Sequence, residues 1–280
     1  MRVIVFGASG MVGHGALRAC LLDDEVSEVL AVVRRPLSVT HPKLRQIVHG
    51  DFTDYTAIQD QLSDLDACLF CLGVSSVGLG EEEYTRVTYD YTLAAARALN
   101  AASPPLTFVY VSGEGTDSTG TSRRMWARVK GRTENDLLAL PMTSYMFRPG
   151  YIHPVNGATS RTPAYRALYP LTTALYPLLR RALPRHVTTT DALGRAMLVV
   201  ARSGTTSARV LDTPASTAWQ RPDRATRPTS LARRASQGGD GTYGRHDRAP
   251  PRVVSGGGLD TGDASEPGGE MWATKAGRSD

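Results

Sequence analysis

The chain has 280 residues, of which 41% are hydrophobic and 21% are charged, so it is long enough to bury a sizeable core. Its formal charge of +5 is spread along the sequence, mostly on arginine, and neither a basic stripe nor a reading motif indicates a specific nucleic-acid partner. No apolar run reaches the roughly 18 residues of a membrane span, and no signal-peptide pattern precedes the first apolar run. We therefore expect a cytoplasmic globular protein.

Three cysteines, Cys20, Cys68 and Cys71, are too few for a disulfide framework. Cys68 and Cys71 have the spacing of a redox or metal pair, but both lie in an apolar run that is typical of a buried strand. Residues three apart on a strand point to opposite faces. We therefore expect core thiols in a reducing compartment and no metal site.

Short β-branched runs alternate with helical stretches through the first half of the chain. The expected strands are residues 3–6, 29–33, 46–49, 67–72, 106–112 and 144–148. The expected helices are residues 12–22, 82–101 and 123–140, with a short helical turn around 55–65. Strands that are apolar throughout and alternate with helices indicate a parallel sheet covered on both faces. The predicted fold class is α/β, a Rossmann-type doubly wound parallel sheet.

Two segments after residue 150 differ from this pattern. Residues 150–212 contain tyrosine, proline and arginine, then a helix for which Thr190 is the expected N-cap. We expect this region to cover the open end of the sheet and to form part of a substrate pocket, so that residues 1–212 make one NAD(P)-binding domain. Residues 213–280 hold only four Leu or Val residues and no Ile, too few to build a core. We expect a low-complexity, disordered tail; the alternative is an out-of-frame reading of GC-rich DNA.

A glycine-rich run, Gly7-Ala-Ser-Gly-Met-Val-Gly13, directly follows the first expected strand and opens the first expected helix. A tight turn in this place lets backbone N–H groups converge on a pyrophosphate, and the helix N-terminus adds partial positive charge. Bulkier residues at the glycines would hold the phosphate away. The context of strand, turn and helix makes the motif a strong indication of dinucleotide binding. The predicted contacts are Gly7, Ser9, Gly10, Met11, Val12 and Gly13.

The second expected strand ends in Arg34 and Arg35, where an NAD-specific site usually places a carboxylate for the ribose hydroxyls. Guanidinium groups bind a 2′-phosphate through charge-assisted hydrogen bonds. We therefore expect NADP(H) in preference to NAD(H), the alternative being a solvated arginine pair.

Residues after the third and fourth expected strands complete the cofactor site. Asp51 and Phe52 follow the third strand, where an acidic side chain can accept from the adenine amino group. Leu72 and Gly73 close the fourth strand, where a small residue lets the backbone approach the adenosine half of the cofactor.

From residue 1 to 212 the chain resembles the atypical or extended short-chain dehydrogenase/reductases, in particular the group related to epimerase/dehydratases and NmrA-like proteins. The motifs that carry the resemblance are Gly7-Ala-Ser-Gly-Met-Val-Gly13, Gly50-Asp-Phe52, Cys71-Leu-Gly73, Val111-Ser-Gly113, Val129-Lys-Gly131 and Phe147-Arg-Pro-Gly150. In that family a serine after the fifth strand binds the substrate oxygen, and Ser112 matches it. A helical lysine binds the nicotinamide ribose and lowers the pKa of a tyrosine four residues earlier, and Lys130 matches the lysine.

The chain departs from the family at the tyrosine, because Trp126 occupies that position. An indole N–H donates a hydrogen bond but is not a usable acid or base near neutral pH. Substitutes to consider are Ser122, one turn before Trp126 if the helix starts early enough, and Tyr151 and His153 after the sixth strand.

The resemblance leaves two main functions open. The first is an NADP(H)-dependent oxidoreductase or epimerase-like enzyme on a small molecule, with Ser112 and Lys130 in the site. The second is a sensor or regulatory protein that binds NADP(H) without turnover; a scaffold without cofactor is a third. Relatives use the helix of Trp126 for pairing, so a homodimer is also an expectation.

Overall fold

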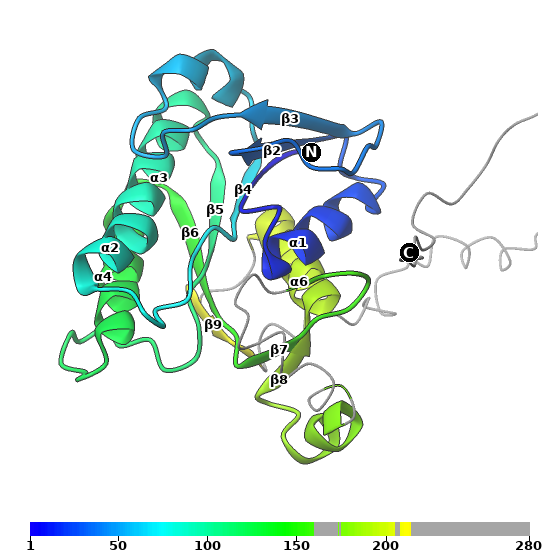
Figure 1. The fold of residues 1–280 in the computed structure, drawn as a ribbon. Coiled ribbons are helices and arrows are strands. Elements are labelled where there is room, and N and C mark those ends of the chain that lie inside the picture. The colour runs from blue at the N-terminus through cyan, green and yellow to red at the C-terminus, as the bar shows by residue number, and fades with distance from the viewer. Residues whose placement is uncertain (160–172, 174, 205–207, 214–280) are drawn as a thin grey trace, which may run out of the picture. The chain divides into compact units, whose positions relative to one another are not determined.

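The computed structural model describes residues 1–159, 173, 175–204 and 208–213, all of them within one compact unit, Met1–Thr226 (Figure 1). The prediction for the tail at residues 213–280 lies outside the described residues, with the exception of Thr213.

A single sheet of seven parallel strands organises this part of the chain, with the order β3-β2-β1-β4-β5-β6-β9. The strands are β1 Arg2–Phe6, β2 Glu28–Val33, β3 Leu44–Val48, β4 Ala67–Phe70, β5 Thr107–Val111, β6 Thr143–Arg148 and β9 Val210–Asp212. The order reverses between β1 and β4, which is the switch point of a doubly wound sheet, where ligands bind beyond the carboxyl ends of the strands. The predicted Rossmann-type fold is confirmed.

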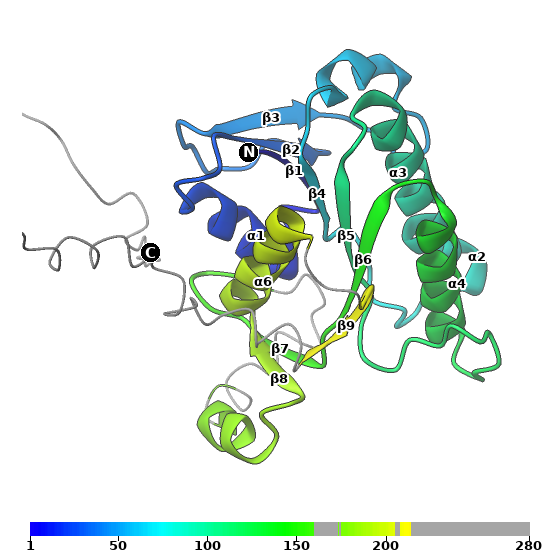
Figure 2. The ribbon, with the colours of Figure 1, turned by 180° about the vertical axis from the view of Figure 1, so that it is seen from behind.

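Helices cover both faces of the sheet (Figures 1 and 2). α1 Met11–Leu21 and α6 Thr190–Ser203 lie on one face, and α3 Tyr91–Ala102 and α4 Met125–Ala139 on the other. Two core clusters follow from this arrangement. Along β1, Val3 and Val5 pack toward α1 and α6, while Ile4 and Phe6 pack in the second cluster with α3. Alternating side chains of one apolar strand thus serve both layers.

The expected helix at residues 82–101 is present with an internal irregularity. α2 Glu81–Thr85 passes into a π-helical segment, Arg86–Asp90, which continues into α3. The expected turn at 55–65 is a 3-10 helix, Thr56–Leu62.

Three short strands of the C-terminal region were not predicted. β7 Tyr151–His153 and β8 Val187–Thr189 pair in parallel as a separate two-stranded sheet, and β9 completes the main sheet beside β6. Strands of three residues carry no readable periodicity. The expected cap of α6 is wrong by one residue, since Thr189 is the N-cap and its hydroxyl accepts from the backbone N of Ala192 at 3.1 Å.

Helices α1 and α6 cross at two glycines. A Cβ on Gly15 would lie 2.3 Å from the carbonyl oxygen of Thr190, and one on Gly194 would lie 2.5 Å from the carbonyl oxygen of Gly15. Both positions therefore need glycine, because the two backbones are in contact. This crossing fixes the C-terminal helix against the helix that begins at the glycine loop.

The cysteines are core residues, as predicted. Cys68 belongs to the cluster on the α3 side, whereas Cys71 packs against the cluster on the α1 side. Burial raises the pKa of the Cys71 thiol to about 12 and that of Cys68 well above its usual range. Both thiols are thus protonated at neutral pH and unsuited to redox chemistry.

Candidate functional site

The glycine loop joins β1 to α1 in the tight turn that its sequence predicts. Gly7 has φ of +75°, and a Cβ there would lie 2.6 Å from the backbone N of Leu72, at the end of β4. A Cβ on Gly13 would lie 2.1 Å from the carbonyl oxygen of Gly7. The backbone N of Gly10 donates to the same oxygen at 2.8 Å, and α1 begins at Met11. The loop therefore places a helix N-terminus beside the switch point of the sheet, where an anion is favoured.

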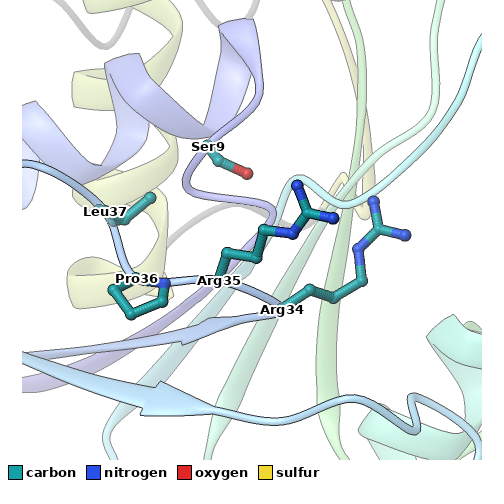
Figure 3. A pocket seen from close by; sticks show the side chains of 5 residues that line it. All are labelled: Ser9, Arg34, Arg35, Pro36 and Leu37. Atoms are coloured by element: carbon teal, nitrogen blue, oxygen red, sulfur yellow. The ribbon is translucent and has the colours of Figure 1, made fainter.

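A cavity of about 530 Å³ lies between the glycine loop and the end of β2. It is lined by Ser9, Arg34, Arg35, Pro36 and Leu37. In Figure 3 both guanidinium groups extend to the same side as the Ser9 side chain. None of the five lining residues is acidic, so the pocket presents two cations and a hydroxyl.

Gln46 of β3 holds the loop that follows the two arginines. Its Oε1 accepts from the backbone N of Leu37 at 2.7 Å, and its Nε2 donates to the carbonyl oxygens of Leu37 and Val39 at 3.4 and 3.3 Å. This role of Gln46 could not be predicted from the sequence, because a glutamine on a strand has no characteristic spacing.

Asp51 and Phe52, which follow β3, have side chains in different environments. The Asp51 carboxylate is exposed and accepts from the hydroxyl and the backbone N of Thr53 at 2.6 and 2.9 Å, which lowers its pKa. The Phe52 ring is buried and stands edge-on to Phe6, with ring centroids 6.5 Å apart. The Phe52 side chain is therefore part of the core beneath this end of the sheet, and the cavity at Arg34 and Arg35 is not lined by it.

The end of β4 is open. A Cβ on Gly73 would meet no atom within 4 Å, and Leu72 is half-buried. This leaves room beside the glycine loop for a ligand that crosses from the β1 side of the sheet to the β4 side.

Ser112 and Lys130 are brought together at the end of β5. The Lys130 ammonium on α4 donates to the carbonyl oxygen of Ser112. Burial lowers the pKa of Lys130 to about 8, a shift that the nearby Glu134 carboxylate opposes. The lysine thus faces the carboxyl edge of the sheet, as its match to the family motif predicts.

The Ser112 hydroxyl is bound inside the protein. It lies 2.5 Å from Oε1 of Glu134 and 3.1 Å from the carbonyl oxygen of Phe147, and both are acceptors. Glu134 is fully buried on α4, and the Arg148 guanidinium donates to it through Nε at 3.0 and 3.1 Å as well as through Nη2. The hydroxyl proton of Ser112 is thus directed into a buried charged network, so the expected hydrogen bond to a substrate oxygen would require this network to rearrange.

Trp126 lies in the first turn of α4, and its indole edge covers the loop that follows β5. Its Cη2 is 3.3 Å from where a Cβ of Gly115 would be, and Gly115 has φ of +82°. Ser122 precedes the helix, which begins at Met125, so the suggestion that Ser122 lies one turn back on the same helical face is wrong. Its backbone N instead donates to the Asp117 carboxylate at 2.6 Å, in the loop before α4.

Tyr151 and His153 lie on β7. The Tyr151 hydroxyl is 3.4 Å from Nδ1 of His153, and the His153 ring stacks on Tyr176 with centroids 4.0 Å apart. Burial lowers the pKa of His153. His153 is therefore a packed, neutral ring, which fits a structural role.

Three polar residues of this region were not singled out from the sequence: Glu134, Glu114 and His186. Glu134 follows Lys130 by four residues, so helical spacing could have placed both on one face. Glu114 and His186 form a hydrogen bond of 2.7 Å between the loop after β5 and the start of β8. They are 72 residues apart, and no local pattern joins them.

In the described part of the chain, no three His, Cys, Asp or Glu side chains gather in a way that would hold a metal ion. None of the helices described has both the length and the apolar character that crossing a bilayer requires.

Comparison with known proteins agrees with this geometry. Residues 3–123 match the model of the NAD dependent epimerase/dehydratase family. Protein FMP52, mitochondrial, from Meyerozyma guilliermondii is 28% identical over 154 residues, a match that covers 54% of this chain and 65% of that protein. A short chain dehydrogenase family protein from Francisella tularensis has the same fold, with a TM-score of 0.55 at 12% identity over 75% of this chain and 95% of that one.

A second solved structure is that of a short-chain dehydrogenase/reductase superfamily protein from Agrobacterium tumefaciens with bound NAD. Its TM-score is 0.53 at 14% identity, over 78% of this chain and 81% of that one. This chain shares its fold with these two short-chain dehydrogenase/reductase structures, and its glycine loop lies at the switch point, where such a sheet binds ligands. Residues 3–123 are thus similar to the NAD dependent epimerase/dehydratase family, which agrees with the resemblance read from the motifs.

Proposed function

We propose that the protein is an NADP(H)-dependent oxidoreductase or epimerase-like enzyme that acts on a carbonyl or hydroxyl group of a small molecule. The observation that carries the proposal is the cavity between the glycine loop and β2, which Arg34 and Arg35 line together with Ser9. The family matched by residues 3–123 uses nicotinamide dinucleotides. The two arginines supply what a 2′-phosphate needs and an unphosphorylated ribose does not.

Cofactor preference is tested by titrating the purified chain with NADPH and NADH and following nicotinamide fluorescence. NADPH should bind more tightly, and Arg34→Ala or Arg35→Ala should each weaken NADPH about tenfold, the lower end for a charge-assisted bond because both side chains are exposed. NADH affinity should barely change. Arg45→Ala is the matched control, since it removes one exposed positive charge from β3, where Arg45 donates to Gln61 at 2.9 Å. Equal or tighter binding of NADH would refute the preference.

Lys130 is proposed as the residue that holds the nicotinamide ribose. The cofactor itself supplies the hydride, and the role of Lys130 is to bind and orient the ribose hydroxyls beside the end of β5. Screening with NADPH against carbonyl compounds and nucleotide sugars should find turnover that Lys130→Ala abolishes. Ser112 is proposed to form part of the substrate site at the end of β5. Its contribution is tested by the effect of Ser112→Ala on turnover.

A sensor or regulatory protein is the second candidate, and two observations favour it. Trp126 occupies the position of the usual proton donor, and the Ser112 hydroxyl is bound to Glu134. Tight NADPH binding without turnover of any compound in the screen would establish this alternative.

Three further proposals concern the length of chain that binds the cofactor, the location of the protein and its oligomeric state. We infer that residues 1–212 suffice for cofactor binding, so a chain ending after Thr213 should keep its NADPH affinity. A cytoplasmic location is proposed, although the name of the Meyerozyma guilliermondii relative includes the word mitochondrial; fractionation decides between the two. Sedimentation analysis tests the proposed homodimer.

A further inference from the structure

A carboxylate and an imidazole meet at the carboxyl edge of β5 and β6. Glu114 follows β5 by three residues, and its backbone N donates to the carbonyl oxygen of Pro149 at 2.9 Å, just after β6. A Cβ on Gly150 would lie 2.5 Å from Oε2 of Glu114 and 2.5 Å from the carbonyl oxygen of His186. Glycine at position 150 therefore lets the Glu114 side chain and the backbone of His186 come together in this place.

His186 is held from two sides. Its Nδ1 is 2.7 Å from Oε1 of Glu114, and its carbonyl oxygen accepts from the backbone N of Tyr151 at 2.7 Å. The Glu114 and His186 side chains are 51% and 54% exposed, so a substrate or water can reach them. The pair is thus accessible, in contrast to the Glu134 carboxylate, which is fully buried.

The chemistry of this pair follows from its hydrogen bond. A carboxylate only accepts, so Nδ1 of His186 carries the proton that it donates to Glu114. Nε2 is then left on the far side of the ring, as a lone pair in the neutral form and as an N–H donor in the charged form. Histidine is the side chain whose ordinary titration spans neutral pH, which is what a general acid or base requires.

The position of the pair corresponds to the reactive half of a dinucleotide site. The strand order places β2 and β3, with the two arginines, on one side of the switch point and β4, β5 and β6 on the other. A dinucleotide that crosses the switch point puts its adenosine over the first group and its nicotinamide over the second. In Figures 1 and 2 β7 and β8 lie beyond the ends of β5 and β6. His186 is the residue directly before β8, which begins at Val187.

We propose that His186 is the catalytic acid and base of this site and that Glu114 is its positioning residue, in place of the proton donor that Trp126 cannot supply. The inference rests on the proposed function. In the reducing direction, a hydride passes from the nicotinamide C4 to the substrate carbonyl carbon, and the π electron pair moves onto the oxygen. That oxygen takes the proton from Nε2 of charged His186, and water returns a proton to the ring. Oxidation runs through the same steps in reverse.

The first experiment places His186 without requiring turnover. Nitrogen NMR of histidine-labelled full-length protein, with the His186 signal assigned through His186→Gln, is followed during titration with NADP⁺ and with 2′-phospho-ADP-ribose. NADP⁺ should shift the His186 signal, whereas the fragment without nicotinamide should bind and leave it unchanged. Binding of NADP⁺ with no shift at His186 would overturn the inference and leave the proposed cofactor intact. Absence of binding by either ligand would instead refute the proposed function.

The second experiment measures catalysis with NADPH and an aromatic aldehyde such as 4-nitrobenzaldehyde, alongside the compounds that the screen identifies. His186→Gln should lower kcat by about 10²- to 10⁴-fold, the usual effect of losing a positioned acid or base, with NADPH affinity unchanged. Because the side chain is exposed, added imidazole should restore activity to His186→Ala. Glu114→Gln should lower kcat more than it raises KM, and Glu114→Asp should recover part of the loss.

Arg185→Gln is the matched control, as it alters the neighbouring exposed side chain and should leave kcat unchanged. If His186→Gln leaves turnover unchanged, the inference about His186 is overturned, whereas the proposed enzymatic function stands. A loss of activity that imidazole does not rescue, accompanied by an equal loss of thermal stability, would also overturn it, since the pair would then only fasten β8 to the loop after β5. NADPH binding without turnover of any compound would refute both the catalytic role of His186 and the proposal that the protein is an enzyme.

Discussion

Removing the charge of Glu134 on α4 should destabilise the fold. The Glu134 carboxylate is fully buried, and it accepts from the Ser112 hydroxyl and from the guanidinium of Arg148, whose side chain is 19% exposed. In Glu134→Gln the amide keeps an acceptor for Ser112 but places an N–H group where the carboxylate faced Arg148. The arginine then keeps its charge without its partner.

The expected magnitude follows from the burial of the two partners. Breaking a buried ion pair by removing one member costs about 3–5 kcal/mol. Arg148 retains some contact with solvent, which puts the estimate at the lower end, about 3 kcal/mol. For a domain of this size that corresponds to a fall in Tm of about 6–12 °C. Glu134→Gln combined with Arg148→Met should recover much of the loss, because neither charge is then left unpaired.

Urea unfolding followed by circular dichroism measures the effect, with the free energy of unfolding compared among the unchanged protein, the two single variants and the double variant. Glu81→Gln is the control: Glu81 of α2 pairs with Arg128 of α4 at 2.8 Å, but the two side chains are 56% and 31% exposed. Such a pair contributes less than about 1 kcal/mol. The reasoning would be refuted if Glu134→Gln cost no more than Glu81→Gln, or if its effect simply added to that of Arg148→Met.

Gly13→Ala should abolish NADPH binding and lower Tm, because its Cβ would lie 2.1 Å from the carbonyl oxygen of Gly7, whereas Gly50→Ala, whose Cβ meets nothing within 4 Å, should change neither quantity. Cofactor titration and thermal unfolding check both variants, and normal binding by Gly13→Ala would contradict the close approach. Lys130 should make the free energy of unfolding rise with pH. Burial lowers the pKa of Lys130 to about 8, whereas a lysine in the unfolded chain has a pKa of about 10.4. Between these two values the unfolded chain binds more protons than the folded protein, so stability increases as the pH rises. Lys130→Met should remove this rise when urea unfolding is compared below pH 8 and between about pH 8 and 10; parallel profiles of the two proteins would count against it.

The sheet could be predicted because most of its strands have a recognisable sequence pattern. Five of the first six, β1, β2, β4, β5 and β6, are mostly apolar and mostly buried, so local pattern and tertiary burial agree. The edge strand β3 holds Arg45 and Gln46 and buries only Ile47. The glycine loop was predictable for a similar reason: Gly13 is required by contact with the backbone of Gly7, six residues earlier, and Gly7 has a positive φ within the turn itself. Local sequence is informative where the cause of a structure is itself local.

The interior of the candidate site was less predictable, since its contacts join residues that are far apart. The Ser112 hydroxyl is directed by Glu134 and Phe147, which lie 22 and 35 residues further along the chain. A family motif identifies Ser112 but does not state which way its hydroxyl points. The Glu114–His186 hydrogen bond depends on β7 and β8, two strands too short to recognise in the sequence.

The last strand of the sheet has a practical consequence for anyone who trims this chain. β9 contributes only residues Val210–Asp212, but these pair with Met146, Phe147 and Arg148 and make β6 an interior strand. Just beyond β9, the Thr213 hydroxyl accepts from the backbone N of Gly150 at 2.9 Å. A chain shortened to end at α6 would expose one side of β6 as a bare row of N–H and C=O groups, a template for sheet-to-sheet aggregation. A shortened chain should therefore extend past Thr213, although the family match ends at residue 123.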